Sequence, residues 1–221
     1  MGFGTFFAGY FLLLDIAWYH ITDVIAAALM ALGLSKLSGI NRGFKAGLAA
    51  SLAFLVFSVA EFVYGAYDML FSAPENPTLI TSIAIIRYVL LSILTLTSFE
   101  GMREVAAEVG LGELSRRCKI SAYLSLFIYV LAIIANTPQI FSGIPPYASA
   151  VFTVVTLLLM LAFYLFNLTL IFGCYSRICM PEESKKTSNT KKQAKPESFK
   201  EAYLRQRRER EEAKAARKED K

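Results

Sequence analysis

The stretch YASAVFTVVTLLLMLAFYLFNLTLIFGCY, from Tyr147 to Tyr175, contains no Asp, Glu, Lys or Arg. A helix that crosses the hydrocarbon core of a bilayer needs roughly 20 mainly apolar residues, so this stretch predicts a transmembrane helix. Three earlier segments meet the same criterion, the last of them with help from the interfacial residues that follow it: Phe44 to Phe71, Leu79 to Phe99 and Ile120 to Ala135. The sequence therefore predicts an all-α integral membrane protein.

The charged residues divide the chain of 221 residues into two parts. Residues 176–221 contain 15 Lys or Arg and 9 Asp or Glu, whereas residues 1–175 contain only 8 and 9. This contrast is typical of a membrane domain with a cytosolic extension, and we predict that the membrane domain covers residues 1–179. We expect residues 180–197 to form a flexible linker, because their composition cannot build a core. Residues 198–221 should form a charged cytoplasmic tail, part helical or disordered.

The segment from Gly2 to Leu34 is too long for one upright helix and is interrupted by Asp15, His20 and Asp23. Two geometries fit this pattern. In the first, a helix from about Leu14 to Leu34 crosses the membrane after an interfacial stretch. In the second, two shorter pieces meet at a break near His20, as in a re-entrant element. The first is the preferred prediction, and it gives about five transmembrane helices.

The Lys and Arg residues predict the orientation, since cytoplasmic loops collect them. They follow the first, third and fifth predicted spans, whereas the loops at residues 72–78 and 137–146 contain none. Every Lys or Arg except Arg87 therefore falls on one side of the membrane. The five-span prediction places the N-terminus outside and the C-terminus in the cytoplasm, in a multi-pass protein of the plasma membrane.

The beginning of the chain carries a two-part pattern. FLLLDI at residues 11–16 is followed by ITDVIAAALMALGLSKLS at residues 21–38. This pair resembles a recurring opening of uncharacterised bacterial membrane proteins, in which an apolar stretch ending in Asp-Ile precedes a second Asp and an apolar run that closes in Gly-Leu. The positions that match are Asp15, Ile16, Asp23, Ile25, Gly33 and Leu34. The resemblance implies a bacterial membrane protein and no established activity.

Several ionisable residues lie inside the predicted spans, where a charge costs on the order of 2.5 to 3.5 kcal/mol at the helix centre. Asp23, Glu61 and Arg87 lie roughly 16, 22 and 18 Å from the inner membrane edge, at a rise of 1.5 Å per residue. Because these depths are similar and the three helices are consecutive, we expect the charges to meet. Helical spacing adds companions on the same helix faces. The predicted polar cluster comprises Asp15, Asp23, Glu61, Tyr64, Asp68 and Arg87.

Two hypotheses explain this polar cluster. In the structural one, Arg87 neutralises Glu61 or Asp23 and holds the first three spans together. In the other, the cluster lines a polar cavity that opens to the outside and binds a cation, a proton or a cationic solute. The excess of acids favours this second hypothesis, because one Arg cannot neutralise four carboxylates.

Catalytic and metal-binding patterns are missing from the sequence. It contains no H-E-x-x-H, G-x-S-x-G or P-loop motif, which excludes the commonest metalloprotease, hydrolase and nucleotidase signatures. A single His without a second His or Cys beside it is weak evidence for a metal site, so His20 is expected to be an interfacial residue. We predict no enzyme, no cofactor and no metal.

Other polar and small residues predict packing and not chemistry. Small residues recur at the helix-packing spacing, which lets two backbones approach closely; they are Gly39, Gly43, Gly47 and Ser51. Asn167 and Tyr164 are expected to form hydrogen bonds between helices. The three cysteines lie near cytoplasmic span ends and should be free thiols; they are Cys118, Cys174 and Cys179.

These observations predict a non-enzymatic membrane protein of structural, partner-binding or regulatory function. Its partners would be the bilayer itself and, through the basic tail, anionic lipid or a cytosolic partner. The alternative is a small transporter or channel-like protein that uses Asp23, Glu61 and Arg87 and that forms a homo-oligomer, because five spans leave little room for a pathway. No specific nucleic acid partner is predicted.

Overall fold

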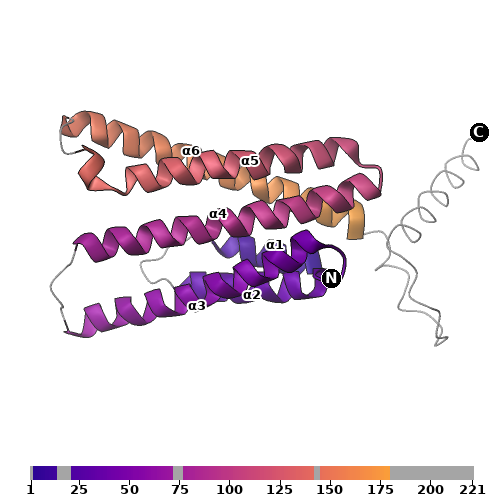
Figure 1. Cartoon of the computed structure of the whole chain (residues 1–221), viewed down its shortest axis with the longest axis horizontal. Helices are drawn as coiled ribbons and strands as arrows, with labels where there is room; N and C mark the ends of the chain where they lie inside the picture. The colour runs from indigo at the N-terminus through magenta and orange to yellow at the C-terminus, as the bar shows by residue number, and fades with distance from the viewer. Residues whose placement is uncertain (1, 14–20, 72–76, 142–144, 180–221) are drawn as a thin grey trace, which may run out of the picture.

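The computed structural model describes residues 2–13, 21–71, 77–141 and 145–179, and within these ranges the chain is helical without strands (Figure 1). The helices are α1 (Gly2–Leu12), α2 (Ile21–Leu37), α3 (Arg42–Phe71), α4 (Pro77–Glu108), α5 (Gly112–Ala135), the 3-10 helix η1 (Pro138–Phe141), α6 (Pro146–Cys174) and the π-helical turn η2 (Tyr175–Cys179). The predicted linker and tail, residues 180–221, lie outside the described residues.

Four of the described helices, α3, α4, α5 and α6, are long and apolar enough to cross a membrane. They correspond to the four segments predicted without ambiguity from the sequence, and the all-α prediction is confirmed. Two of them begin at a proline, Pro77 and Pro146, a residue that suits the first turn because its missing N–H has no helical partner there.

The turn between α4 and α5 is short and well defined. Gly110 has a φ of 76°, and its N–H donates to the carbonyl of Ala107 at 3.1 Å. The N–H of Leu111 donates to the carbonyl of Ala106 at 2.8 Å. This pair of bonds forms a Schellman motif, which satisfies the last carbonyls of α4 and requires the left-handed conformation that glycine favours. α5 therefore returns directly along α4.

α1 and α2 form a closely packed antiparallel pair. Gly2 lies beside Leu37 at one end, and Gly9 lies beside Met30 further along. A Cβ on Gly33 would be 2.5 Å from the backbone nitrogen of Phe6, so only glycine allows this approach of the two backbones. We refer to α1 and α2 together as the hairpin.

The described part of this segment consists of two separate helices. α1 and α2 lie side by side and antiparallel, an arrangement that the preferred prediction, an interfacial stretch followed by one spanning helix, did not include. Residues 14–20, with Asp15 and His20, lie outside the described residues.

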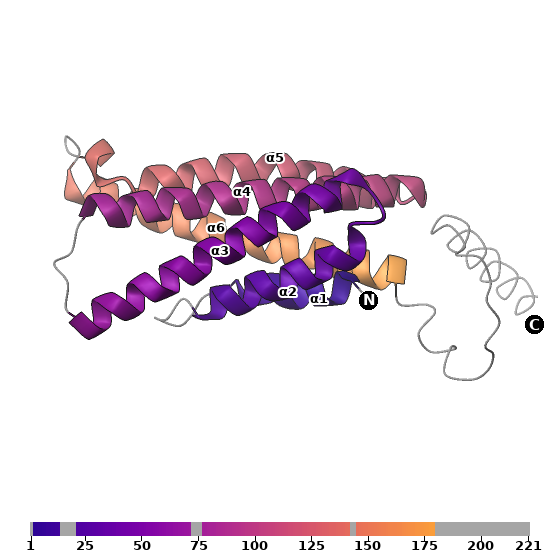
Figure 2. The same ribbon diagram turned by 60° about the horizontal axis from the view of Figure 1, so that its bottom comes forward.

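The long helices follow one another as antiparallel neighbours, and the hairpin packs against α3 through α2 and against α6 through α1. Both ends of the hairpin, the start of α3 and the ends of α4 and α6 gather at one end of the bundle (Figures 1 and 2). Towards the opposite end α3 and α4 diverge (Figure 2). The hairpin therefore fills one half of the bundle.

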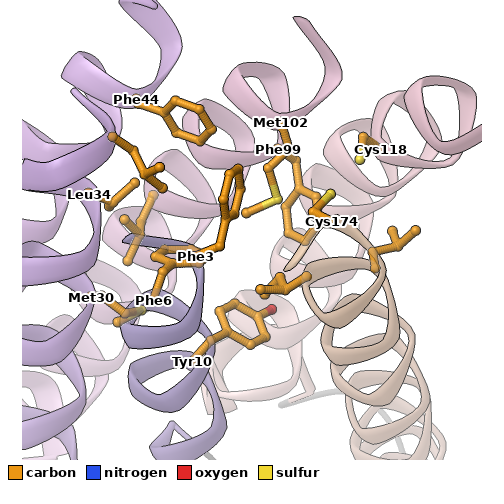
Figure 3. Close-up of a cluster of buried hydrophobic side chains, with 14 of the residues drawn as sticks. Phe3, Phe6, Tyr10, Met30, Leu34, Phe44, Phe99, Met102, Cys118 and Cys174 are labelled. Carbon is orange, nitrogen blue, oxygen red and sulfur yellow. The ribbon is translucent and has the colours of Figure 1, made fainter. Parts of the chain in front are cut away.

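The buried core lies in the half that contains the hairpin. Phenylalanines from α1, α3 and α4 meet there, with the thiols of α5 and α6 close by (Figure 3). In α4 the described buried residues all lie between Leu94 and Ala106, in the second half of the helix. In α3 the last buried residue among those described is Glu61. Cys118 and Cys174 are buried free thiols, which confirms the prediction for these two cysteines.

Close contacts between α3 and α4 confirm most of the predicted small-residue stripe. A Cβ on Gly43 would be 2.7 Å from the Cα of Gly101, and one on Gly47 would be 3.1 Å from the hydroxyl of Ser98. Asn41 fixes this crossing, since its amide donates to the carbonyl of Gly101 at 2.8 Å. Ser51 turns instead to α2, where its hydroxyl donates to the carbonyl of Ala27 at 3.2 Å. Gly39 lies before α3 with open space beside it.

Candidate functional site

Arg87 of α4 joins two carboxylates from two other helices. Its Nη1 lies 3.3 Å from Oε1 of Glu61 on α3, and its Nη2 is paired with Oδ2 of Asp23 on α2. Asp23 is fully buried, Glu61 is almost so, and the Arg87 side chain is 20% exposed. The prediction that these three charges meet is confirmed. We call Asp23, Glu61 and Arg87 the charge cluster.

Each helix positions its charge at the boundary of the core. Asp23 lies in the first turn of α2, where the helix dipole favours a carboxylate. Glu61 is the last buried residue among the described side chains of α3, and Arg87 lies on the part of α4 that precedes its buried half. The charge cluster therefore lies where the packed half of the bundle ends.

Burying the charge cluster costs free energy, and each of its charges depends on the others to offset that cost. Burying an ion costs several kcal/mol even after relaxation, and its partner offsets this cost only in good geometry. Removing one partner from a buried ion pair typically costs about 3 to 5 kcal/mol, because an uncompensated charge remains. The three side chains carry two formal negative charges and one positive charge. Such a cluster can clamp three helices, and its carboxylates can also carry a proton or bind a cation.

Of the other members of the predicted polar cluster, only the Tyr64 side chain is among those that the structure describes. Tyr64 is half-buried and lies about one turn beyond Glu61 on α3. Asp15 and the side chain of Asp68 lie outside the described part of the chain. Within the described residues, no three of the His, Cys, Asp and Glu side chains are grouped closely enough to hold a metal ion.

Tyr164 of α6 attaches the end of α1 to the bundle. Its hydroxyl lies 2.7 Å from the carbonyl oxygen of Tyr10 and 2.6 Å from that of Phe11, to which it donates. The last carbonyls of a helix have no intrahelical partner, and inside a membrane each unsatisfied group is costly. The rings of Tyr10 and Tyr164 also stack, with centroids 5.4 Å apart.

A second polar group of side chains lies deeper in the core. The Asn167 amide of α6 donates to the hydroxyl of Tyr10 at 2.8 Å, and Ser121 of α5 donates to the Asn167 carbonyl oxygen. On the neighbouring helices, the hydroxyls of Thr95 and Tyr129 lie 3.4 Å apart. The prediction that Asn167 and Tyr164 bond between helices is confirmed, whereas their partners on α1 were not foreseen.

Sequence reasoning missed three buried hydroxyl groups of this region. Tyr10, Tyr129 and Thr95 are buried polar residues inside apolar helices, and each needs a hydrogen-bond partner there. That requirement could have marked them as sites of contact between helices. It could not have indicated which helix supplies the partner.

A cavity of about 90 Å³ lies between the end of α1 and the helices α4, α5 and α6. Arg87 is the member of the charge cluster that lines it, and Tyr10, Leu91, Tyr129 and Phe163 form much of the remaining wall. One of the two hypotheses for the polar cluster was a polar cavity in which carboxylates bind a cation, a proton or a cationic solute. The observed cavity is mainly aromatic and apolar, with the guanidinium at its side.

Searches of protein-family models, of curated proteins and of solved structures found no match to this chain. Its function is therefore inferred from the geometry of the bundle.

Proposed function

We propose that this protein is a multi-pass protein of a bacterial plasma membrane with four transmembrane helices and a re-entrant hairpin. Both ends of the hairpin and the end of α6 would face the cytoplasm. This topology is supported by the basic residues at that end of the bundle: Lys36, Arg42, Lys45, Arg103, Arg116, Arg117, Lys119 and Arg177. It replaces the predicted outside location of the N-terminus, because Gly2 lies beside Leu37 and not at the opposite end.

The function that the geometry supports best is structural and partner-binding, without catalysis. The observation that carries it is the contact of Arg87 with both Asp23 and Glu61. One guanidinium between two carboxylates from two helices is the arrangement expected of a clamp that holds the hairpin, α3 and α4 in one register. Such a rigid membrane domain would present the basic tail to anionic lipid or to a cytosolic partner.

A transporter is the second candidate, and one specific observation favours it. The cavity reaches the charge cluster at Arg87, and a cluster of two carboxylates and one guanidinium in contact with a cavity can take up a proton or a small cation. A homo-oligomer would then supply the rest of a pathway, since four helices enclose little space.

Reconstitution into liposomes separates the two candidates. The clamp requires that thermal stability in detergent falls when Arg87→Gln leaves both carboxylates without their cation, and that proton and cation flux stays at the level of empty liposomes. Flux above that level, abolished by Glu61→Gln while the thermal stability is unchanged, would instead establish transport. The exposed pair Arg117 and Glu113 provides a control, because Arg117→Gln should change neither quantity.

A further inference from the structure

The cavity beside Arg87 has a size that restricts what it can hold. Its volume is about 90 Å³. A water molecule occupies about 30 Å³ in the liquid, and an engineered apolar cavity of about 150 Å³ stays dry and binds benzene. The cavity therefore has room for about three water molecules.

The wall of the cavity provides the polar partners that bound water requires. Arg87, Tyr10 and Tyr129 line the cavity. A guanidinium has five N–H donors, and a tyrosine hydroxyl can both donate and accept. The Tyr10 hydroxyl accepts a hydrogen bond from the Asn167 amide. A buried water molecule typically makes about three hydrogen bonds, which donors and acceptors from three helices can supply here.

We propose that this cavity is an internal water site, in which about three water molecules bind between the Arg87 guanidinium and the hydroxyls of Tyr10 and Tyr129. These waters hydrate the charge cluster from within the bundle and so reduce the cost of holding its charges in the membrane. They also connect the charge cluster to the deeper hydrogen bonds of Tyr10, Asn167 and Ser121. This water site does not depend on whether the protein is a clamp or a transporter.

Radiolytic hydroxyl labelling of the full chain in lipid nanodiscs, read by mass spectrometry, tests this proposal. Hydroxyl radicals formed from bound water label the side chains next to it. Phe163 lines the cavity and is 5% exposed, whereas Phe99 is fully buried in the dry core and Phe127 is 59% exposed to the membrane side. We expect Phe163 to be labelled several times faster than both Phe99 and Phe127.

A cavity-filling variant provides the second measurement. Leu91→Phe places a larger side chain in the cavity and should lower the labelling of Phe163 several-fold. Leu126→Phe is the matched control, because Leu126 is 43% exposed on the outer surface of α5, and it should leave that labelling unchanged. Labelling of Phe163 as slow as that of Phe99 in the parent protein would show a dry or lipid-filled cavity and would overturn the proposal. Equal labelling of Phe163 in the parent and in Leu91→Phe would overturn it as well.

Discussion

The hydroxyl of Tyr164 lies 2.6 Å from the carbonyl oxygen of Phe11, two residues that are 153 positions apart in the sequence. Through this bond α6 supplies a donor to the last turn of α1. Two other helices thus hold the hairpin. α6 contacts the end of α1 through Tyr164, and α4 contacts the start of α2 through the charge cluster.

Tyr164→Phe should destabilise the protein by about 1 to 3 kcal/mol, because it removes the hydroxyl that donates to the end of α1 at Tyr10 and Phe11. Thermal unfolding in detergent measures this loss, and hydrogen exchange should show faster opening of α1 than of α5. Tyr147→Phe on the same helix removes a hydroxyl from a residue that is 74% exposed and should have no effect. Equal effects of the two variants would contradict the attachment.

Arg87→Gln should destabilise the protein by about 3 to 5 kcal/mol, because it leaves Asp23 and Glu61 buried without their cation. The triple change with Asp23→Asn and Glu61→Gln removes all three charges and should restore much of the loss. Thermal unfolding in detergent measures both. A neutral Arg87→Gln, or a triple variant no more stable than the single one, would contradict the clamp.

Gly43→Ala should destabilise the bundle by about 1 to 3 kcal/mol, because the new Cβ would meet the backbone of Gly101 and force α3 and α4 apart. Gly65→Ala is a matched control on the same helix, with open space where the Cβ would lie. This control should be neutral or stabilising by up to about 1 kcal/mol, since alanine is the better helix former. The two melting temperatures measure the difference.

Reporter fusions test the proposed topology. Alkaline phosphatase joined before residue 1 should be inactive in a bacterial host, and green fluorescent protein at the same site should fluoresce, because both report a cytoplasmic start of α1. Phosphatase fused after Phe71 should be active, since that end of α3 faces outward in this topology. An active phosphatase at the N-terminus would restore the five-span topology.

The convergence of Asp23 and Arg87 could be predicted from the sequence because depth in a membrane follows directly from position along a helix. Consecutive helices joined by short loops pack side by side, so similar depth implies contact. The four long spans were predictable for the same reason, since their length is set by the thickness of the bilayer.

The choice between one spanning helix and the hairpin could not be made from the sequence, because apolarity does not distinguish a segment that crosses the membrane from one that turns back within it. What decides between them is the match of Gly9 and Gly33 to the backbone of the opposing helix, which exists only once the two helices are antiparallel. The partners of Asn167 could not be predicted either, because they depend on which helices pack together. Its bond to Tyr10 joins residues 157 positions apart, and no local pattern encodes that distance.

The attachment of the hairpin also has a consequence for biogenesis. α1 and α2 leave the ribosome before the helices that hold them, because Arg87 is synthesised 64 positions after Asp23 and Tyr164 is synthesised 154 positions after Tyr10. The hairpin therefore waits in the membrane for α4 before Asp23 meets Arg87, and for α6 before the end of α1 meets Tyr164. A nascent chain that stops before α6 would lack the contact of Tyr164 with α1, so the packing of the hairpin is completed only when α6 has been made.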